Sequence, residues 1–330
     1  MAKNKEHQHV VPKAYLRGFA NAEEEVSVRR RGEKQTKRLH INNVAVRSGF
    51  YNFVDLAGQQ TDTLESWFDT DIESPAAPVL KSLWVASGPF QGGTADLVPL
   101  TRFVAAQLLR TPTVAAYMGH IDDHIRPIAY TIELLKQPGL SAADLSEAEL
   151  DDWRQSGQRM ADEHATSGDR ESRLRTIMRK FVEFSDELSA RQWATLVSDD
   201  PLLITGDAPV ATLNPIGVGW QGLLPPGAPV LMPLTPTRLL VGEEVALSGD
   251  VVLTPEFARA VNNQIALNVD DALIKEPSAA WPSYLDLGPS RPRLPAPRIT
   301  MTKSDAAPTP LRYPPVTDAA VGQLLRKLGA

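Results

Sequence analysis

The residues of this sequence that could carry acid–base chemistry are scattered over segments far apart in the chain. Near the start, His9 stands three positions before Pro12, and proline suits the first turn of a helix that we expect over 12–19. The N-terminal end of a helix favours the neutral imidazole, which suits a general base or a ligand, whereas the alternative is a histidine that caps backbone groups. Tyr15 and Phe19 share one helix face, as core residues do, yet a buried tyrosine usually finds a polar partner, so Tyr15 is a candidate substrate contact.

Four carboxylates form one stripe along a second helix, which the residue pattern predicts over 62–82. At 100° per residue they fall within about 80° of arc, beside an apolar stripe. The stripe belongs to Asp62, Glu65, Asp69 and Glu73. Such a stripe can line a cleft, bind a cation or share protons, and it is also what a solvated helix face looks like. We expect the helix to bend near Pro75 and Pro78.

Gln107 and Arg110 lie one turn apart at the end of an apolar helix predicted over 96–110. An arginine in such a place needs a carboxylate or phosphate partner, because an unpaired buried charge is very costly. One reading is an ion pair with Glu65 or Glu73 that ties two helices together. The other is a clamp for an anionic substrate, to which Gln107 adds a hydrogen-bonding amide.

Asp207 follows the apolar run 202–204 and precedes Pro209, so it belongs at the end of a strand. Acidic residues at such positions are frequently catalytic, because binding and catalytic groups concentrate on the loops that leave a rigid scaffold. The alternative is a turn in which the carboxylate accepts hydrogen bonds from nearby amides.

A series of short motifs follows a set order along the chain. They are His9-Val-Val-Pro12-Lys-Ala-Tyr15-Leu16-Arg17-Gly-Phe19, Phe50-Tyr51, Glu65 with Glu73, and the segments 107–112, 204–210 and 232–236. This order resembles a bacterial family known as domain of unknown function 4238, whose members open with HxxPxxYLxxF. The resemblance covers roughly residues 7–275 and implies the architecture, together with roles for Glu65, Glu73 and Asp207. Gly206 and Ala208 depart from the family, which usually has Ser and Asn there, while Asp207 is kept.

Metal and cofactor signatures are weak in this sequence. His120 and His124 have the i, i+4 spacing of a two-histidine metal site, but no third ligand stands nearby, so we expect a solvated helix and assign no metal ligands. The acidic side chains leave a divalent metal such as Mg²⁺ possible as a cofactor. The P-loop, GxGxxG, GxSxG and HExxH motifs are all missing, so nothing indicates a nucleotide cofactor.

Composition and charge restrict the class of protein. The chain has 330 residues, a formal net charge of -6 and no cysteine, which rules out disulfides and thiolate chemistry. Basic residues cluster on one predicted hairpin, where they favour either phosphate contacts or a solvated sheet edge. They are Arg29, Arg30, Arg31, Lys34, Lys37 and Arg38. Since neither a signal peptide nor an apolar membrane span is recognisable, we expect a cytoplasmic protein with no membrane partner.

The order of elements predicts an α+β fold, with a mainly helical body, a small N-terminal hairpin and a C-terminal β-rich portion. Helices and strands are segregated along the chain rather than alternating, which argues against a doubly wound parallel sheet. We expect strands at 193–198, 202–205, 229–234 and 238–242. We expect helices at 113–137, at 145–192 with an interruption at 167–169, at 254–273 and at 317–328. The predicted segments are 1–192, 193–275 and a proline-rich tail with a terminal helix at 276–330.

Three functions are compatible with these residues. The first is a hydrolase or transferase acting on a small anionic ligand, with catalytic His9, Glu65, Glu73 and Asp207 and substrate contacts from Tyr15, Gln107 and Arg110. The second is a nuclease-like, Mg²⁺-dependent effector directed at nucleic acid, which the acidic overall charge does not favour. The third is a binding or scaffold protein without catalysis, in which the polar residues form a buried structural network.

Overall fold

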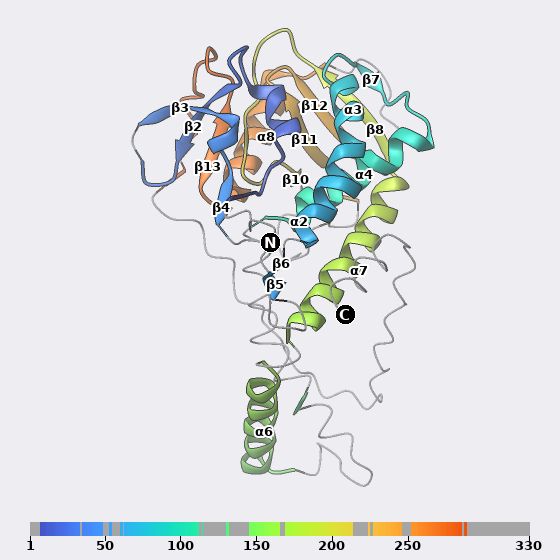
Figure 1. The fold of residues 1–330 in the computed structure, drawn as a ribbon, viewed down its shortest axis with the longest axis vertical. Helices are drawn as coiled ribbons and strands as arrows, with labels where there is room; N and C mark the ends of the chain where they lie inside the picture. Colours follow the sequence, from blue (N-terminus) through green and yellow to red (C-terminus); the bar gives the residue numbers. More distant parts are fainter. Residues whose placement is uncertain are drawn as a thin grey trace.

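Antiparallel sheets and packed helices make up the fold, as a computed structural model of the chain shows (Figure 1). The structure describes residues 7–33, 35–48, 53–54, 60–61, 63–111, 114, 130–131, 145–165, 169–213, 224, 227–245, 252–285 and 287–288. Because both helices and antiparallel sheets are present, the predicted α+β class is confirmed. Most of the predicted helix at 113–137, with His120 and His124, lies outside the described residues, as do Phe50, Tyr51, Asp62 and the terminal helix.

A five-stranded sheet, in the order β10-β11-β12-β8-β7, forms the centre of the molecule. Its strands are β7 (Gly88–Pro89), β8 (Gln192–Val197), β10 (Ala211–Thr212), β11 (Val230–Thr235) and β12 (Arg238–Glu243). Alternate residues of β11 enter two different cores: Met232 packs with the helices, whereas Leu231 packs with α8 (Pro255–Asn268). Both faces of this sheet are thus covered, which explains the uninterrupted apolar runs of β11 and β12.

A second sheet contains four strands in the order β3-β2-β13-β9. They are β2 (Glu25–Arg30), β3 (Thr36–His40), β9 (Thr205–Gly206) and β13 (Ala272–Lys275). The predicted N-terminal hairpin is confirmed as β2 and β3, turning at Gly32 with its positive φ of 73°. Two small pairs complete the strands: β1 (His7–His9) with β4 (Val46–Ser48), and β5 (Phe53–Val54) with β6 (Gln60–Thr61).

The prediction of one helix over 254–273 is wrong at its end. Thr254 caps α8 by accepting a hydrogen bond from the Phe257 amide, and Pro255 opens the helix as expected. The helix ends at Asn268, however, and 272–275 form strand β13, which pairs with both β2 and β9. A short buried run such as this has no periodicity that separates a strand from a helix end. The predicted strand at 202–205 is likewise reduced to β9.

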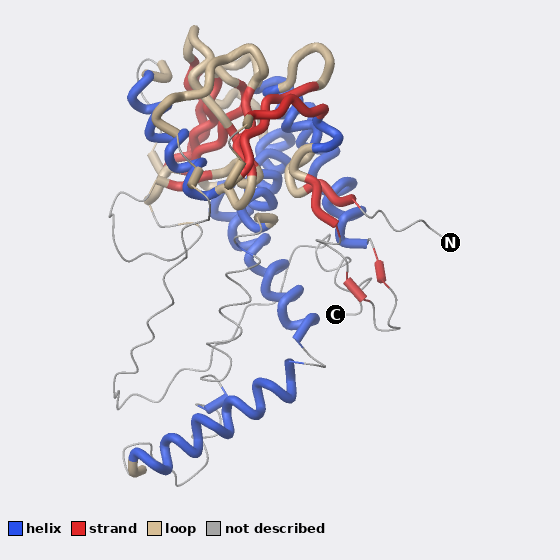
Figure 2. The backbone as a smooth tube through the Cα atoms, turned by 90° about the vertical axis from the view of Figure 1, so that its left-hand side faces the viewer, coloured by secondary structure: helices blue, strands red, loops and turns tan. Residues whose placement is uncertain are grey.

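The helices of the body lie against one face of the five-stranded sheet, with α3, α4 and α7 side by side (Figure 1). The helical elements are α1 (Lys13–Leu16), η1 (Arg17–Phe19), η2 (Ile41–Asn43), α2 (Thr63–Trp67), η3 (Phe68–Glu73), α3 (Ser74–Leu83), α4 (Thr94–Leu109), α6 (Glu147–Ala165) and α7 (Asp169–Ser189). Figure 2 shows α6 apart from the sheets. Within the described part of the chain, no helix is both long and apolar enough to cross a membrane.

The first helical turns pack tightly on the central sheet. A Cβ atom added at Gly18 would stand 2.1 Å from the Leu234 carbonyl oxygen, so only glycine permits this approach of η1 to β11. Tyr15, Leu16 and Phe19 are fully buried around this contact. Because strands from both sides of residue 192 share the two larger sheets, the predicted segments 1–192 and 193–275 are closely interleaved.

Candidate functional site

A pocket of about 350 Å³ lies where α1, the helical segment formed by α2 and η3, and the end of α4 meet. It is lined by His9, Lys13, Ala14, Arg17, Glu65, Asp69, Glu73, Ser74, Ala77 and Arg110. Four of the seven predicted site residues therefore come together here, although they stand up to 101 positions apart: His9, Glu65, Glu73 and Arg110. Asp69 of the predicted acidic stripe joins them. Convergent polar groups in a concave site are the usual mark of a binding or active site.

The pocket has a basic wall and an acidic wall. Lys13 and Arg17 are four residues apart at the start of the chain and form the basic wall. Glu65, Asp69 and Glu73, each four residues from the next, form the acidic wall. Sequence reasoning missed the basic wall, although the i, i+4 spacing of its two residues within the predicted first helix was visible.

Asp69 and Glu73 of the acidic wall lie on a π-helical segment, η3, which continues α2. The Ser74 amide donates its hydrogen bond to Asp69, five residues back, and the wider helical turn extends over η3. Pro75 follows directly: it has no amide hydrogen to donate, and its ring would clash with the carbonyl four residues earlier. The sequence predicted a bend at this place, and the structure has a π segment, a rare element that is frequent at functional sites.

Arg110 adopts the ion-paired arrangement, one of the two that the sequence left open. Its side chain is 3% exposed, and Nη1 pairs with Oε1 of Glu73. Nη2 donates to the His9 carbonyl oxygen at 2.9 Å, and the guanidinium lies 4.3 Å from the centre of the Phe68 ring. Arg110 thereby ties the end of α4 to the acidic wall and to β1, since it contacts all three.

His9 occupies the pocket as a neutral imidazole. Burial is the main cause that lowers its pKa, and the neighbouring charges of Lys13 and Arg110 act in the same direction, while hydrogen bonding to the backbone of Asn42 and Ile41 opposes them. Nε2 is buried and has no hydrogen-bond partner among the described residues. The backbone contacts therefore belong to Nδ1, which leaves the lone pair of Nε2 available to a bound molecule.

Asp207 and Tyr15 lie away from the pocket. The Asp207 carboxylate accepts hydrogen bonds from the amides of Asp270 and Asp271 at 2.9 and 2.8 Å, and so fixes the turn between α8 and β13. This is the amide-capping alternative that the sequence left open. The Tyr15 hydroxyl donates to the Pro233 carbonyl and lies 2.7 Å from the Thr205 hydroxyl, inside the core. Burial raises the pKa of Tyr15, which keeps the hydroxyl protonated.

Replacing Asp207 with asparagine is expected to lower the free energy of unfolding by roughly 1 to 3 kcal/mol. The asparagine amide group would face a backbone N–H that the carboxylate now satisfies, so one buried donor would lose its partner. Chemical denaturation measures the change, with Asp200→Asn as the control at an exposed aspartate. Wild-type stability of Asp207→Asn would contradict this structural role.

Gln107 is buried beside the site and does not line it. Its side chain is 1% exposed, and neither its oxygen nor its nitrogen has a hydrogen-bond partner among the described residues. Gln107→Met, which keeps the volume and removes both polar atoms, is expected to raise the free energy of unfolding by roughly 1 to 3 kcal/mol. Denaturation with exposed Gln192→Met as the control measures this. A loss of stability would instead mean that an internal water satisfies the amide.

The basic residues of the hairpin are engaged within the protein. Arg31 donates to the carbonyl oxygens of Asp270 and Val269 at 2.9 and 2.8 Å, just beyond α8. Further partners are Trp281 and Leu285 for Arg29, Asp271 for Arg30, Glu33 for Lys37 and Glu25 for Arg38. Lys34 lies outside the described residues. Arg29 and Arg31 are thus held against the segments that follow α8, whereas Lys37 and Arg38 form exposed ion pairs on the hairpin itself.

In the part of the chain that the structure describes, no group of three or more His, Asp or Glu side chains is arranged to hold a metal ion.

Comparison with known proteins confirms the family that the order of motifs in the sequence suggested. Neither a curated protein nor a solved structure shows detectable similarity to the chain. A family model described as "Protein of unknown function (DUF4238)" matches residues 7–278, which is most of the chain. The chain therefore belongs to the DUF4238 family.

Proposed function

We propose that this chain is an enzyme, a hydrolase or transferase, that uses His9 as its general base on a small polar substrate. The observation that carries the proposal is the buried Nε2 of His9, which has no partner among the described residues at the wall of a charged pocket. A buried polar atom without a partner is costly, and at the wall of a pocket a bound ligand or a catalytic role accounts for one.

In this proposal, His9 removes a proton from the attacking group. Nε2 accepts the proton from a water molecule in a hydrolase, or from an acceptor hydroxyl in a transferase, while that oxygen attacks the substrate. The protonated imidazole then returns the proton to the leaving group. Its lowered pKa keeps His9 unprotonated near neutral pH, which is the form that a base requires.

The carboxylates of the pocket take different parts. Glu73 is paired with Arg110, and we assign it to holding Arg110 and, through the His9 carbonyl, the backbone next to the base. Glu65 and Asp69 line the same wall, and their carboxylates are the candidate groups for a positive or hydroxyl-bearing part of the substrate. Asp207 is no longer proposed as an acid or base, because its carboxylate is held by two backbone amides.

The test is a thermal-shift screen of the purified chain against small phosphorylated and carboxylated metabolites, with and without Mg²⁺. A ligand at about 100 times its dissociation constant adds roughly 2.7 kcal/mol of stability. Hits are then assayed for turnover with the wild type and with His9→Gln. Turnover that is lost in His9→Gln supports the proposal, and undiminished turnover in that variant overturns it.

A non-catalytic binding protein is the second candidate, and the contacts of Arg110 favour it. An arginine that joins α4, the acidic wall and β1 is what a purely structural network would contain. Under this reading, ligands that stabilise the protein are released unchanged. The same screen therefore separates the two candidates, because only the enzyme converts a ligand that it binds.

A further inference from the structure

We infer that Arg17 is the oxyanion-recognition residue of the pocket, and that Glu24, which lies outside it, is the residue that positions Arg17. The inference rests on the proposed pocket and assigns to it a ligand with a carboxylate or phosphate group. The residue types had indicated Arg110 for this role, but its guanidinium is occupied by Glu73 and by the His9 carbonyl. We assign the role to Arg17 of the basic wall instead.

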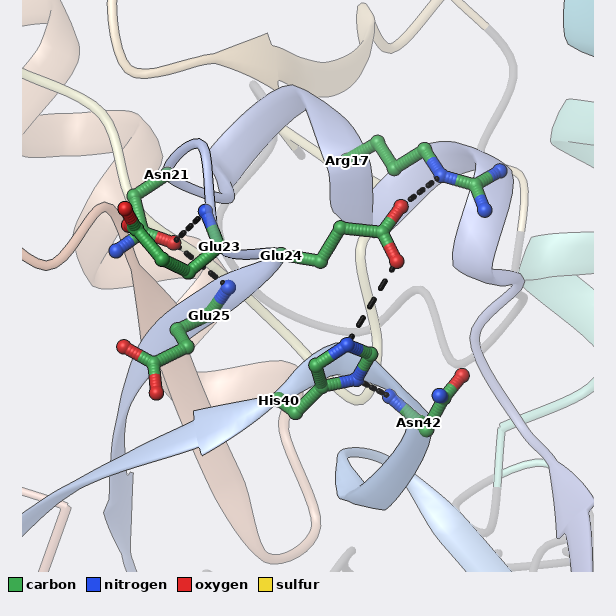
Figure 3. Close-up of polar contacts among 7 residues, drawn as sticks. All are labelled: Arg17, Asn21, Glu23, Glu24, Glu25, His40 and Asn42. Atoms are coloured by element: carbon green, nitrogen blue, oxygen red, sulfur yellow. Dashed lines mark hydrogen bonds and ion pairs between the residues drawn. The ribbon is translucent and has the colours of Figure 1, made fainter.

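The guanidinium of Arg17 is held by one nitrogen and open at the other two. Nε donates to Oε1 of Glu24 at 2.7 Å, and the side chain is 50% exposed. Among the residues that the structure describes, the two terminal nitrogens have no hydrogen-bond partner, and they point away from Glu24 (Figure 3). A guanidinium fixed in this way presents paired N–H donors, the geometry that binds carboxylate or phosphate through two parallel hydrogen bonds.

Glu24 is held in an unusual backbone conformation that directs its carboxylate to Arg17. Its φ angle is 55°, in the left-handed region that glycine and asparagine usually occupy. The Asn21 side chain fixes the turn by accepting hydrogen bonds from the amides of Glu23 and Glu25, at 3.1 and 2.8 Å (Figure 3). A strained backbone conformation at a residue other than glycine supports the assignment of a role to its side chain.

His40 supports the second oxygen of Glu24. Its Nε2 lies 3.7 Å from Oε2 of Glu24, and its Nδ1 accepts a hydrogen bond from the Asn42 amide at 3.2 Å (Figure 3). Since Nδ1 accepts that bond, the neutral ring carries its proton on Nε2, toward Glu24. The hydrogen bond from Arg17 lowers the pKa of Glu24, which keeps the carboxylate charged.

Lys13 adds a second positive charge to the same wall. It stands one helical turn before Arg17, lines the pocket, and has no hydrogen-bond or ion-pair partner among the described residues. The field of Lys13 reaches both His9 and Glu24. An anionic group that binds between Lys13 and Arg17 therefore places the rest of the ligand near His9, since all three residues line one pocket.

The experiment titrates the purified chain with inorganic phosphate and, separately, acetate, at constant ionic strength set with chloride. Binding is followed by the NMR signals of the His9 imidazole, assigned with His9→Gln. Arg17→Gln is expected to weaken phosphate or acetate binding by roughly tenfold or more, because it removes charge-assisted hydrogen bonds. Tighter binding of phosphate assigns a phosphorylated ligand, and tighter binding of acetate a carboxylated one. Arg38→Gln removes a similar exposed, paired arginine that does not line the pocket and serves as the control.

Two variants of Glu24 separate positioning from charge. Glu24→Gln and Glu24→Gly both remove a negative charge, which by itself makes the pocket more attractive to an anion. Only glutamine keeps an oxygen that can accept from Arg17 Nε. We expect phosphate binding to weaken roughly 2- to 12-fold in Glu24→Gly, because the Arg17 side chain is no longer held in place, and to be at least as tight as in the wild type in Glu24→Gln. Glycine suits the φ angle of 55°, so Glu24→Gly folds without strain.

The outcomes are distinct. Unchanged or tighter binding in Glu24→Gly overturns the positioning role, and unchanged binding in Arg17→Gln overturns the oxyanion site. If neither probe binds to the wild type, the oxyanion inference fails as a whole. None of these results depends on turnover, so the proposal that His9 acts as a base is decided separately by the activity of His9→Gln.

Discussion

Arg110→Met is expected to lower the free energy of unfolding by about 3–5 kcal/mol, because removing one partner of a buried ion pair leaves the other charge uncompensated. Arg110 is 3% exposed and Glu73 is 18% exposed, so water reaches the glutamate poorly. The variant also loses the hydrogen bond to the His9 carbonyl and the packing on the Phe68 ring. Chemical denaturation measures the loss.

The double variant Arg110→Met, Glu73→Gln shows how much of the loss comes from the unpaired carboxylate. We expect it to be more stable than Arg110→Met alone, with a coupling energy of roughly 0.5 to 3 kcal/mol, because the two side chains are in contact. Arg38→Met, which breaks an exposed pair with Glu25, should cost only about 0 to 1 kcal/mol. A loss of that small size in Arg110→Met would show that the Arg110–Glu73 ion pair contributes little to the free energy of unfolding.

His9→Gln is expected to reduce kcat/KM by roughly 10² to 10⁴-fold for a substrate found in the screen, the usual contribution of a general base. In the wild type, kcat/KM should fall on acidification with a midpoint below the ordinary histidine pKa of about 6.5, because the folded protein lowers the pKa of His9. This fall on the acidic side of the pH profile (the acid limb) disappears in His9→Gln, because the remaining activity no longer depends on protonation of residue 9.

The free energy of unfolding should also depend on pH through His9. Between the lowered pKa of His9 in the folded state and about 6.5 in the unfolded chain, the unfolded state binds more protons, so the free energy of unfolding rises with pH across this window. His9→Gln removes that rise. Asp207→Asn is a control that loses stability outside the pocket and keeps the acid limb. An unchanged pH profile in His9→Gln would contradict the assignment of His9.

The sequence predicted local elements well because their signals are local. Thr254 with Pro255 marked the start of α8, and the glycine turn at Gly32 marked the β2–β3 hairpin. The end of α8 was predicted wrongly, since 272–275 become a strand only through pairing with β2 and β9, which lie far away in the chain. Long-range pairing of this kind leaves no trace in a window of neighbouring residues.

The candidate site was predictable in part for the same reason. The types of His9, Glu65, Glu73 and Arg110 suggested chemistry, and the tertiary structure brings them to one pocket. Asp207 has the same residue type as a catalytic acid, and its role as an amide acceptor depends on a turn at 270–271 that the sequence did not indicate. The position of Arg17 in the pocket depends on its contact with Glu24, which no spacing rule predicts.

The pairing of β2 with β13 also fixes when the protein can finish folding during its synthesis. Arg30 and Asp271 form an ion pair across 241 positions of sequence, so β13, the strand that binds β2, is synthesised long after β2 itself. Until then, the early hairpin keeps an open edge and its buried side chains exposed. During synthesis, the second sheet therefore cannot be completed until β13 has been made. If translation is slow between residues 30 and 272, we expect the unpaired hairpin to aggregate or to bind chaperones.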